Sequence, residues 1–421
     1  MRVFFKTFGC RLNKAEALQM EADYLADGWE LSDTESTADL IVVRGCSVTA
    51  VAQHDCEKYI AQLRLRYPKT RIKACGCLPS NGEAESLPLQ NRTEPSIFRS
   101  GKDSASPLST PLPTRTARAY LKVQDGCSGR CTFCIVPTFR GESRSVPISK
   151  VIDTAKRFLD AGYHELVVTG CNLSLYASEG MRLPELLSAL AELESQHAQA
   201  RSGKDSASPL SSASPFRIRL GSLEPGSCAQ EVVHCMAEHA NICRFLHLPI
   251  QSGSDRILAA MNRPYRIEAI HSLVETATRL MPRLGLGCDL MAGFPSETDA
   301  DFAATSELLN RHPFCNVHVF PYSERPGTSA ATFADVVPVP VRTIRAAELS
   351  AIAKTKREAY AQSFVGQTVE IVVEGHDKTV GWTGEYLRCE AEGAAPRKSL
   401  VRVRVTHTDG DRLLGSLVSE S

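Results

Sequence analysis

Short apolar runs alternate with amphipathic stretches along residues 1–79, which is the pattern of strands followed by helices. Each amphipathic stretch is long enough to cross back over a sheet, so we expect parallel strands in an α/β domain. Strands are predicted at 3–5, 40–43 and 71–74, with helices at 14–27 and 50–67.

The same alternation continues through residues 118–335. Strands with helices outside them predict a second α/β unit, a partial or full (β/α) barrel, whose functional loops follow the carboxyl ends of the strands. Strands are predicted at 119–123, 165–168, 216–220, 245–248, 286–291 and 316–320. Helices are predicted at 149–161, 183–194, 229–239, 267–281 and 298–311.

The chain changes character on both sides of this core. Residues 80–117 are polar, and the stretch RSGKDSASPLS at 99–109 recurs identically at 201–211, which indicates an inserted flexible segment. Residues 340–364 predict a long basic helix. The β runs at 369–373, 382–389, 400–406 and 413–418 predict a small all-β barrel. The predicted parts are 1–98, a linker at 99–117, the core at 118–340, a helical connector at 341–364 and a barrel at 365–421.

Composition narrows the class of protein. The 421 residues have a formal net charge of zero, so any RNA binding requires a local basic patch. The first residues lack the apolar core of a signal peptide, and no apolar run reaches the roughly 20 residues of a membrane span. We therefore expect a cytoplasmic protein with no membrane partner.

The chain has 15 cysteines. In the cytoplasm, so many cysteines indicate metal ligation or catalysis more than disulfides. Seven of them lie in apolar patterns and are predicted to be core residues: Cys56, Cys228, Cys235, Cys243, Cys288, Cys315 and Cys389.

Cys127, Cys131 and Cys134 form a CxxxCxxC triplet just after the first predicted strand of the core. Three thiolates hold three irons of a [4Fe–4S] cluster and leave the fourth iron open to a substrate such as S-adenosylmethionine (SAM). A structural zinc site and a ferredoxin-like electron carrier are alternatives, but both normally use a fourth ligand. The triplet therefore predicts a radical SAM enzyme, with a non-catalytic iron–sulfur protein or a zinc-supported RNA-binding module as the other classes.

Three more cysteines follow the three predicted strands of the N-terminal domain. Cys10, Cys46 and either Cys75 or Cys77 occupy these positions, and loops at the carboxyl ends of parallel strands meet in space. Gly76 favours Cys77, because a small residue lets the loop approach a cluster closely. Buried structural thiols are the alternative interpretation.

Taken together, the motifs resemble the methylthiotransferase family of radical SAM enzymes. The similar stretches run in order from FKTFGCRLN, IVVRGCSVT and ACGCLPS to HLPIQSGSDRIL, DLMAGFPSET and HVFPYSERPGTSA. The resemblance implies a flavodoxin-like first domain, in which Cys10, Cys46 and Cys77 hold an auxiliary [4Fe–4S] cluster. It also implies a C-terminal RNA-binding barrel of the TRAM type, a reducing electron donor and a sulfur source.

The branches of this family differ in substrate. GCRLN at 9–13, CSVT at 46–49 and HVFPYS at 318–323 resemble the branch that modifies N6-threonylcarbamoyladenosine in tRNA. The resemblance therefore implies transfer of a methylthio group to C2 of that nucleoside at position 37. Isopentenyladenosine in tRNA and a ribosomal-protein aspartate are the alternatives. One departure is Arg44-Gly45, where the family usually has Asn-Thr.

Other polar and basic residues complete the predicted sites. Residues at strand ends are candidates for the SAM pocket, and tight-turn geometry is the alternative for each: Thr169, Gly170, Ser222, Glu224, Gln251, Ser252 and Gly253. Basic residues near one strand of the C-terminal barrel are predicted to contact tRNA: Arg397, Lys398, Arg402 and Arg404. The same role is predicted for basic residues of the connector, with a solvated basic face as the alternative: Arg342, Arg345, Lys354, Lys356 and Arg357.

Overall fold

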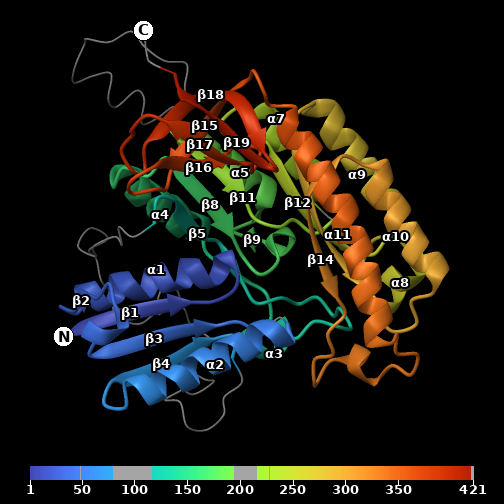
Figure 1. The fold of residues 1–421 in the computed structure, drawn as a ribbon, viewed down its shortest axis with the longest axis horizontal. Coiled ribbons are helices and arrows are strands. Elements are labelled where there is room, and N and C mark those ends of the chain that lie inside the picture. Colours follow the sequence, from blue (N-terminus) through green and yellow to red (C-terminus); the bar gives the residue numbers. More distant parts are fainter. Residues whose placement is uncertain (48, 79–115, 194–215, 227, 419–421) are drawn as a thin grey trace.

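A computed structural model describes residues 1–47, 49–78, 116–193, 216–226 and 228–418 (Figure 1). Both copies of the repeated stretch and most of the predicted linker lie outside the described residues. Among the helices that are described, none combines the length and the apolar character needed to cross a membrane.

The N-terminal part is a parallel sheet with a helix on each face, so the α/β prediction is confirmed. Its strands lie in the order β2-β1-β3-β4. Every residue of β3 is buried, because α1 covers one face of the strand and α2 covers the other. The elements are β1 (Arg2–Thr7), α1 (Arg11–Ala26), β2 (Glu30–Leu31), η1 (Glu35–Thr37), β3 (Leu40–Gly45), α2 (Ala50–Arg66) and β4 (Arg71–Gly76).

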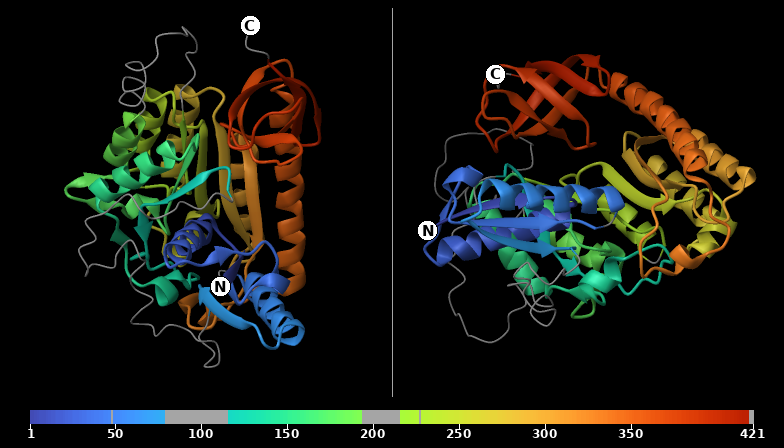
Figure 2. Two further views of the ribbon diagram at one scale, coloured as in Figure 1. Left: turned by 90° about the vertical axis from the view of Figure 1, so that its left-hand side faces the viewer. Right: turned by 60° about the horizontal axis from the view of Figure 1, so that its bottom comes forward.

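The central part is an open wall of six parallel strands, which confirms the partial barrel (Figure 2). Bridges from Ile218 to Ile242 and from Ser222 to His247 join its two three-stranded halves. The strands are β5 (Ala119–Lys122), β8 (Glu165–Thr169), β11 (Arg217–Leu220), β12 (Phe245–Gln251), β13 (Gly285–Ala292) and β14 (Phe314–Pro321).

Helices cover the outer face of this wall, and the largest apolar core of the protein lies between the two layers. Leu246 and Leu286 of the strands pack there with Val232 and Leu308 of the helices. Side chains alternate between the two faces along a strand. The neighbours of Leu246 and of Leu286 in sequence therefore point to the inner face of the wall. The helices are α4 (Ile148–Asp160), α5 (Leu183–Ala191), α7 (Ala229–Glu238), α8 (Asp255–Ala260), α9 (Ile267–Leu280) and α10 (Asp299–Arg311).

Helix α11 (Val339–Gln362) packs along β14 and leads into a closed barrel of strand order β15-β16-β17-β19-β18. The prediction of one strand at 382–389 is wrong, because the chain reverses between β16 and β17. Tyr386 in that turn has φ 68°, and apolar alternation alone does not reveal such a turn. The strands are β15 (Thr368–Val373), β16 (Thr379–Thr383), β17 (Arg388–Glu392), β18 (Leu400–Asp409) and β19 (Arg412–Leu417).

Buried arginines fasten the C-terminal barrel to the core. Arg217 and Arg219 of β11 donate to the backbone oxygens of Trp382 and Thr383, at 2.6 Å and 2.7 Å. Both also pair with Glu165, which is fully buried. Burial acts to raise the pKa of Glu165, but Arg219 and Arg217 outweigh it and hold that pKa far below its usual range. Removing the barrel would take the backbone acceptors of Trp382 and Thr383 away from both arginines and leave Glu165 as their partner.

Candidate active site

The loop after β6 (Gln124–Asp125) gathers the three cysteines of the CxxxCxxC triplet. A Cβ built on Gly129 would lie 3.2 Å from the Cys127 sulfur and 3.9 Å from the Cys131 sulfur, so the loop wraps closely around that glycine. The backbone N–H of Cys134 donates to the oxygen of Cys131 at 3.1 Å, which turns the third thiol back toward the others. Burial raises the pKa of Cys134 to about 11. These free thiols suit metal ligation, in which the metal replaces the proton.

Arg263 supports this loop from the core. Its guanidinium donates to the Cys131 sulfur at 3.1 Å and pairs with Glu224 at 2.9 Å. The amide of Asn172 donates to the other oxygen of Glu224 at 3.0 Å. A buried cation beside a thiolate offsets the negative charge that a cysteine-ligated cluster carries. Glu224, predicted from its position after β11, thus belongs to the surroundings of the triplet.

The other candidate pocket residues also lie at or just beyond strand ends. Thr169 ends β8, and Gly170 packs against Gln124, whose Oε1 would lie 2.8 Å from an added Cβ. Ser222 follows β11 and bridges to His247 of β12. These positions face the same end of the strand wall as the cysteine loop.

The candidate residues in the turn after β12 have two different environments. Gln251 ends the strand with φ 77°. Ser252 and Gly253 are instead held by Thr305 of α10, which accepts the backbone N–H of Gly253 at 2.9 Å. An added Cβ on Gly253 would lie 2.5 Å from the oxygen of Ala304, so close packing requires this glycine. These contacts favour the tight-turn role for Ser252 and Gly253.

The structure brings three loops of the N-terminal sheet together at one edge. Cys10 caps the start of α1 and is exposed, whereas Cys46 and Cys77 are 6% exposed. An added Cβ on Gly9 would lie 2.9 Å from the Cys46 sulfur. The backbone N–H of Cys77 donates to the oxygen of Gly45 at 3.2 Å. Cysteines far apart in sequence therefore converge, as their positions after parallel strands predict.

Cys75 lies in a different environment from Cys77. Its sulfur accepts a contact from Arg44 at 3.8 Å, and its side chain packs in the cluster that α1 covers. Gly76, with φ 92°, then turns the chain so that Cys77 leaves the strand. This geometry favours Cys77 over Cys75 as the third member of the group.

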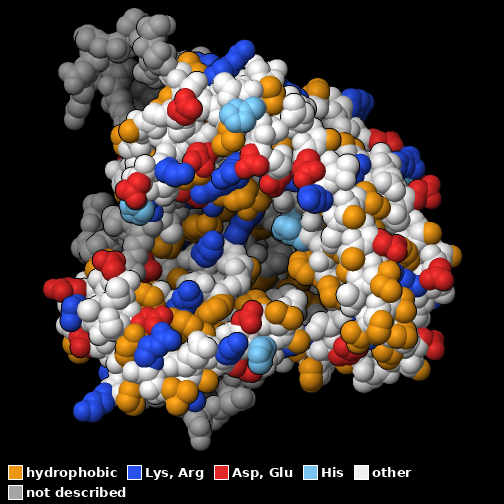
Figure 3. Space-filling view, in the orientation of Figure 1, with side chains coloured by type: hydrophobic (Ala, Val, Ile, Leu, Met, Phe, Trp, Pro, Cys, Tyr) orange, Lys and Arg blue, Asp and Glu red, His pale blue; other side chains and the backbone are white. Residues whose placement is uncertain are grey.

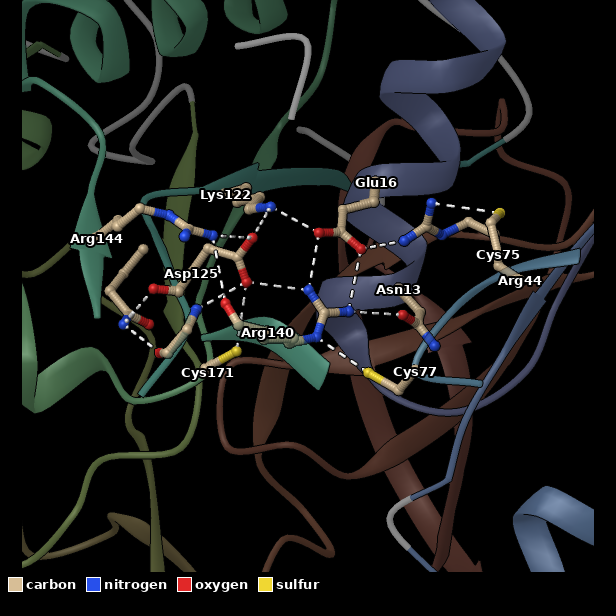
Figure 4. A network of polar contacts seen from close by, with 12 residues as sticks. Asn13, Glu16, Arg44, Cys75, Cys77, Lys122, Asp125, Arg140, Arg144 and Cys171 are labelled. Carbon is tan, nitrogen blue, oxygen red and sulfur yellow. Dashed lines mark hydrogen bonds and ion pairs between the residues drawn. The ribbon is translucent and has the colours of Figure 1, made fainter. Parts of the chain in front are cut away.

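Arg140, which follows the triplet loop in sequence, contacts Cys77 of the N-terminal group (Figure 4). It ends the short helix α3 (Val136–Arg140), which begins just after Cys134. Its Nε donates to the Cys77 sulfur at 3.0 Å, and its other nitrogens bond Asn13 at 3.0 Å and Asp125 at 3.0 Å. One guanidinium therefore holds the end of the triplet loop against the N-terminal cysteine edge.

Glu16 is the acidic centre of the same network. It accepts from Arg140 at 2.9 Å and from Lys122 at 2.6 Å, and it also pairs with Arg44. Burial acts to raise the pKa of Glu16, but these three cations hold it well below its usual value. Arg44 belongs to the Arg44-Gly45 departure from the family pattern, and the structure gives it Glu16 as a partner.

Sequence analysis missed Asn13, Glu16 and Arg140 as site residues. Asn13 is fully buried, and its amide donates to the oxygens of Phe8 and Gly45, at 2.9 Å and 2.8 Å. It lies three positions before Glu16 on the helix that begins after Cys10, so both share one face. The three-residue spacing of Asn13 and Glu16 after Cys10 was the signal in the sequence that could have identified these two residues.

Glu16→Gln is expected to lower the free energy of unfolding by about 3 kcal/mol, because Arg44, Lys122 and Arg140 lose the carboxylate that they share and only the last two keep an acidic partner, Asp125. The depressed pKa of Glu16 means that its stabilisation is present above the ordinary glutamate pKa of about 4.3 and is lost as pH falls below it. Urea unfolding at several pH values, followed by tryptophan fluorescence, measures both effects. Glu57→Gln, at an exposed site on α2, should change stability by less than about 0.5 kcal/mol. Equal stability of the two variants would contradict the role of Glu16.

The fold and the three-cysteine loop together define a radical SAM enzyme, a class that uses a [4Fe–4S] cluster and SAM. Residues 121–309 match the Radical SAM superfamily, and residues 2–94 match a family described as Uncharacterized protein family UPF0004. A cobalamin-binding radical SAM methyltransferase, TsrM of Kitasatospora setae, has a similar fold, with a TM-score of 0.51 and 13% identity. The similar region covers 78% of this chain and 77% of that one.

Two relatives extend the similarity over nearly the whole chain. A tRNA-2-methylthio-N(6)-dimethylallyladenosine synthase of Methylacidiphilum infernorum is 31% identical, over 89% of this chain and 85% of that protein. Threonylcarbamoyladenosine tRNA methylthiotransferase MtaB of Bacillus subtilis is 30% identical, over 93% and 90%. The chain therefore belongs to the methylthiotransferase family of radical SAM enzymes.

Proposed function

We propose that this enzyme transfers a methylthio group to C2 of N6-threonylcarbamoyladenosine at position 37 of tRNA. The observation that carries the proposal is the set of stretches GCRLN, CSVT and HVFPYS, which resemble the threonylcarbamoyladenosine branch. Relatives named for the dimethylallyl and the threonylcarbamoyl substrates match at nearly equal identity, so the choice rests on these stretches.

We also propose two [4Fe–4S] clusters, one on the Cys127 triplet and one on Cys10, Cys46 and Cys77. When bound, the first supplies the electron that cleaves SAM to a 5′-deoxyadenosyl radical, and the second supplies the sulfur. The free thiols and the cations beside Cys131 and Cys77 support this donor set. A reducing electron donor and a sulfur source are the implied partners.

The chain's own residues position these groups. Arg140 and Glu16 hold the two cysteine edges together, which keeps the sulfur donor close to the carbon that loses hydrogen. A hollow opens between the N-terminal domain and the C-terminal barrel, and Lys, Arg and His side chains border it (Figure 3). Such a hollow suits an anionic RNA loop that delivers one base to the site.

The C-terminal barrel supplies the proposed RNA surface through Arg402 and Arg404. Both are exposed on the outer face of β18. Lys398 and Arg397 are engaged elsewhere: the Lys398 ammonium lies 4.0 Å from the Tyr163 ring, and Arg397 donates to the oxygen of Glu374 at 3.3 Å.

Two of the connector arginines do not share this role. Arg342 is 3% exposed and pairs with Glu324, and Arg345 is 6% exposed and pairs with Glu297. The prediction that these two contact phosphates is wrong, because hydropathy along α11 does not show that acidic partners of the core lie beside them.

Arg402→Glu/Arg404→Glu is expected to weaken tRNA binding at least about tenfold at low salt and to flatten its salt dependence, because phosphate contacts are lost. Filter binding over a salt series measures both quantities. Lys150→Glu/Arg279→Glu makes the same charge change at exposed sites on the outer helices and should leave binding nearly unchanged. Equal weakening by both double variants would assign the effect to total charge alone.

Product identity tests the proposed function. Anaerobically reconstituted enzyme, SAM and reductant are given tRNA bearing either threonylcarbamoyladenosine or dimethylallyladenosine, followed by nucleoside mass spectrometry. We expect the 2-methylthio product only from the first tRNA. Product only from the dimethylallyl tRNA, or only on a ribosomal protein, would overturn the substrate assignment.

A further inference from the structure

Two histidines and an aspartate meet on the inner face of the strand wall, apart from both cysteine groups. His247, Asp289 and His318 come from the neighbouring strands β12, β13 and β14. The Nε2 of His247 lies 3.0 Å from Asp289 Oδ1, and the Nδ1 of His318 lies 3.1 Å from the same oxygen. The adjacent residues Leu246, Leu248, Cys288 and Leu290 pack into the outer core, so the triad faces inward.

Exposure differs sharply across this triad. The side chain of His247 is 6% exposed, that of Asp289 is 21% exposed and that of His318 is 51% exposed. The other ring nitrogen of His318, Nε2, makes no hydrogen bond with any residue that the structure describes. His318 is therefore the most exposed member of the triad, and its strand β14 runs beside the hollow (Figures 1 and 3).

Along the strands, one inward-facing pair of residues separates the triad from the end of the wall at which the CxxxCxxC loop lies. His318 is the register partner of Asp289, and the next inward pair along the strands is Phe320 with Met291. Met291 packs against the apolar cluster that contains Phe294 and Tyr322, and Phe133, which lies between Cys131 and Cys134, packs against the same cluster. Two residues along a strand span about 6.6 Å. A base held beside the triplet loop would thus have a substituent within reach of His318.

Asp289 fixes the orientation of His318. Burial acts to raise the pKa of Asp289, but the hydrogen bonds from His247 and His318 outweigh it and hold that pKa far below its usual range. The ionised carboxylate anchors Nδ1 of His318, and a histidine anchored in this way presents Nε2 in a fixed direction. His247 also contacts Oδ1 of Asp289, so the two histidines together restrict rotation of the carboxylate.

We propose that His318, oriented by Asp289, binds the polar N6 substituent of the target adenosine and selects threonylcarbamoyl over dimethylallyl. This inference rests on the proposed function and names the residue that reads the substrate. Threonylcarbamoyl offers a carboxylate, a hydroxyl and amide groups to an imidazole edge, whereas dimethylallyl offers only carbon. A hydrogen-bonding site rejects an apolar analogue because its own polar group is then left without a partner.

The test compares binding of the holoenzyme to three anticodon stem-loops that differ only at position 37: threonylcarbamoyladenosine, dimethylallyladenosine and unmodified adenosine. The parent should bind the first about 10- to 100-fold more tightly than the third, the range of one charged hydrogen bond. His318→Phe keeps the ring and should lose that preference, whereas His318→Gln should keep part of it. Asp289→Asn should reduce the preference, because Nε2 loses its fixed direction. His234→Phe, at an exposed site on α7, is the matched control.

Each measurement is a ratio within one variant, so partial misfolding cancels. A parent that prefers the dimethylallyl stem-loop would overturn the proposed function. A parent that prefers threonylcarbamoyl, together with a His318→Phe variant that keeps the preference, would overturn this inference alone. The three side chains also have the ligand types of a metal site. Loss of the parent's preference after chelator treatment that leaves the cluster absorbance intact would assign recognition to a cation and overturn the role of the imidazole.

Discussion

Replacing Cys127, Cys131 and Cys134 together by Ala is expected to abolish 5′-deoxyadenosine formation and to remove about half of the bound iron. The three thiols lie on one loop, and no other cysteine of the described residues belongs to that loop, so no further thiol on the loop can replace them. Anaerobic reconstitution, iron analysis and chromatography of SAM products measure the outcome. Residual SAM cleavage at the parent rate would show that the radical site lies elsewhere.

Replacing Cys10, Cys46 and Cys77 together by Ala is expected to give the opposite pattern. SAM cleavage should persist and iron should again fall by about half, but thiomethylated nucleoside should be absent because the sulfur route is lost. Each triple variant is therefore the control for the other. Thiomethylated product at the parent level would rule out an auxiliary cluster on these three residues.

Cys75→Ala is the matched single variant in the same domain. Cys75 contacts Arg44 and packs toward α1, so its loss should leave product formation close to that of the parent. An inactive Cys75→Ala variant beside an active Cys77→Ala variant would transfer the third ligand to Cys75.

Several features follow from local sequence because they depend on neighbouring residues. All seven cysteines predicted as core residues are buried, since each lies in or just before a helix or strand that carries apolar residues. The strands of both α/β parts lie close to their predicted positions for the same reason. The CxxxCxxC triplet is likewise local, because one short loop carries all three sulfur atoms.

Sequence analysis did less well for charged residues whose interaction partners are distant in the sequence. Arg342 and Arg345 follow a basic pattern along α11, yet both are buried against glutamates of the core. Lys398 is close to Arg402 in sequence, but a turn directs it toward Tyr163. An arginine in water and an arginine in a buried ion pair have the same local sequence, so only the positions of distant acids distinguish them.

The sequence by itself determined most of the helices and strands, the order of the α/β parts and the barrel, the SAM-type cysteine loop and the family. The tertiary structure alone decided how these parts meet. It brings Arg140 to Cys77, gathers Glu16 with three cations and sets His318 on Asp289. The physical reason is the separation in sequence between the residues that interact. Strand and helix patterns arise from residues a few positions apart, whereas these contacts join segments separated by many residues and depend on how parallel strands stack side by side.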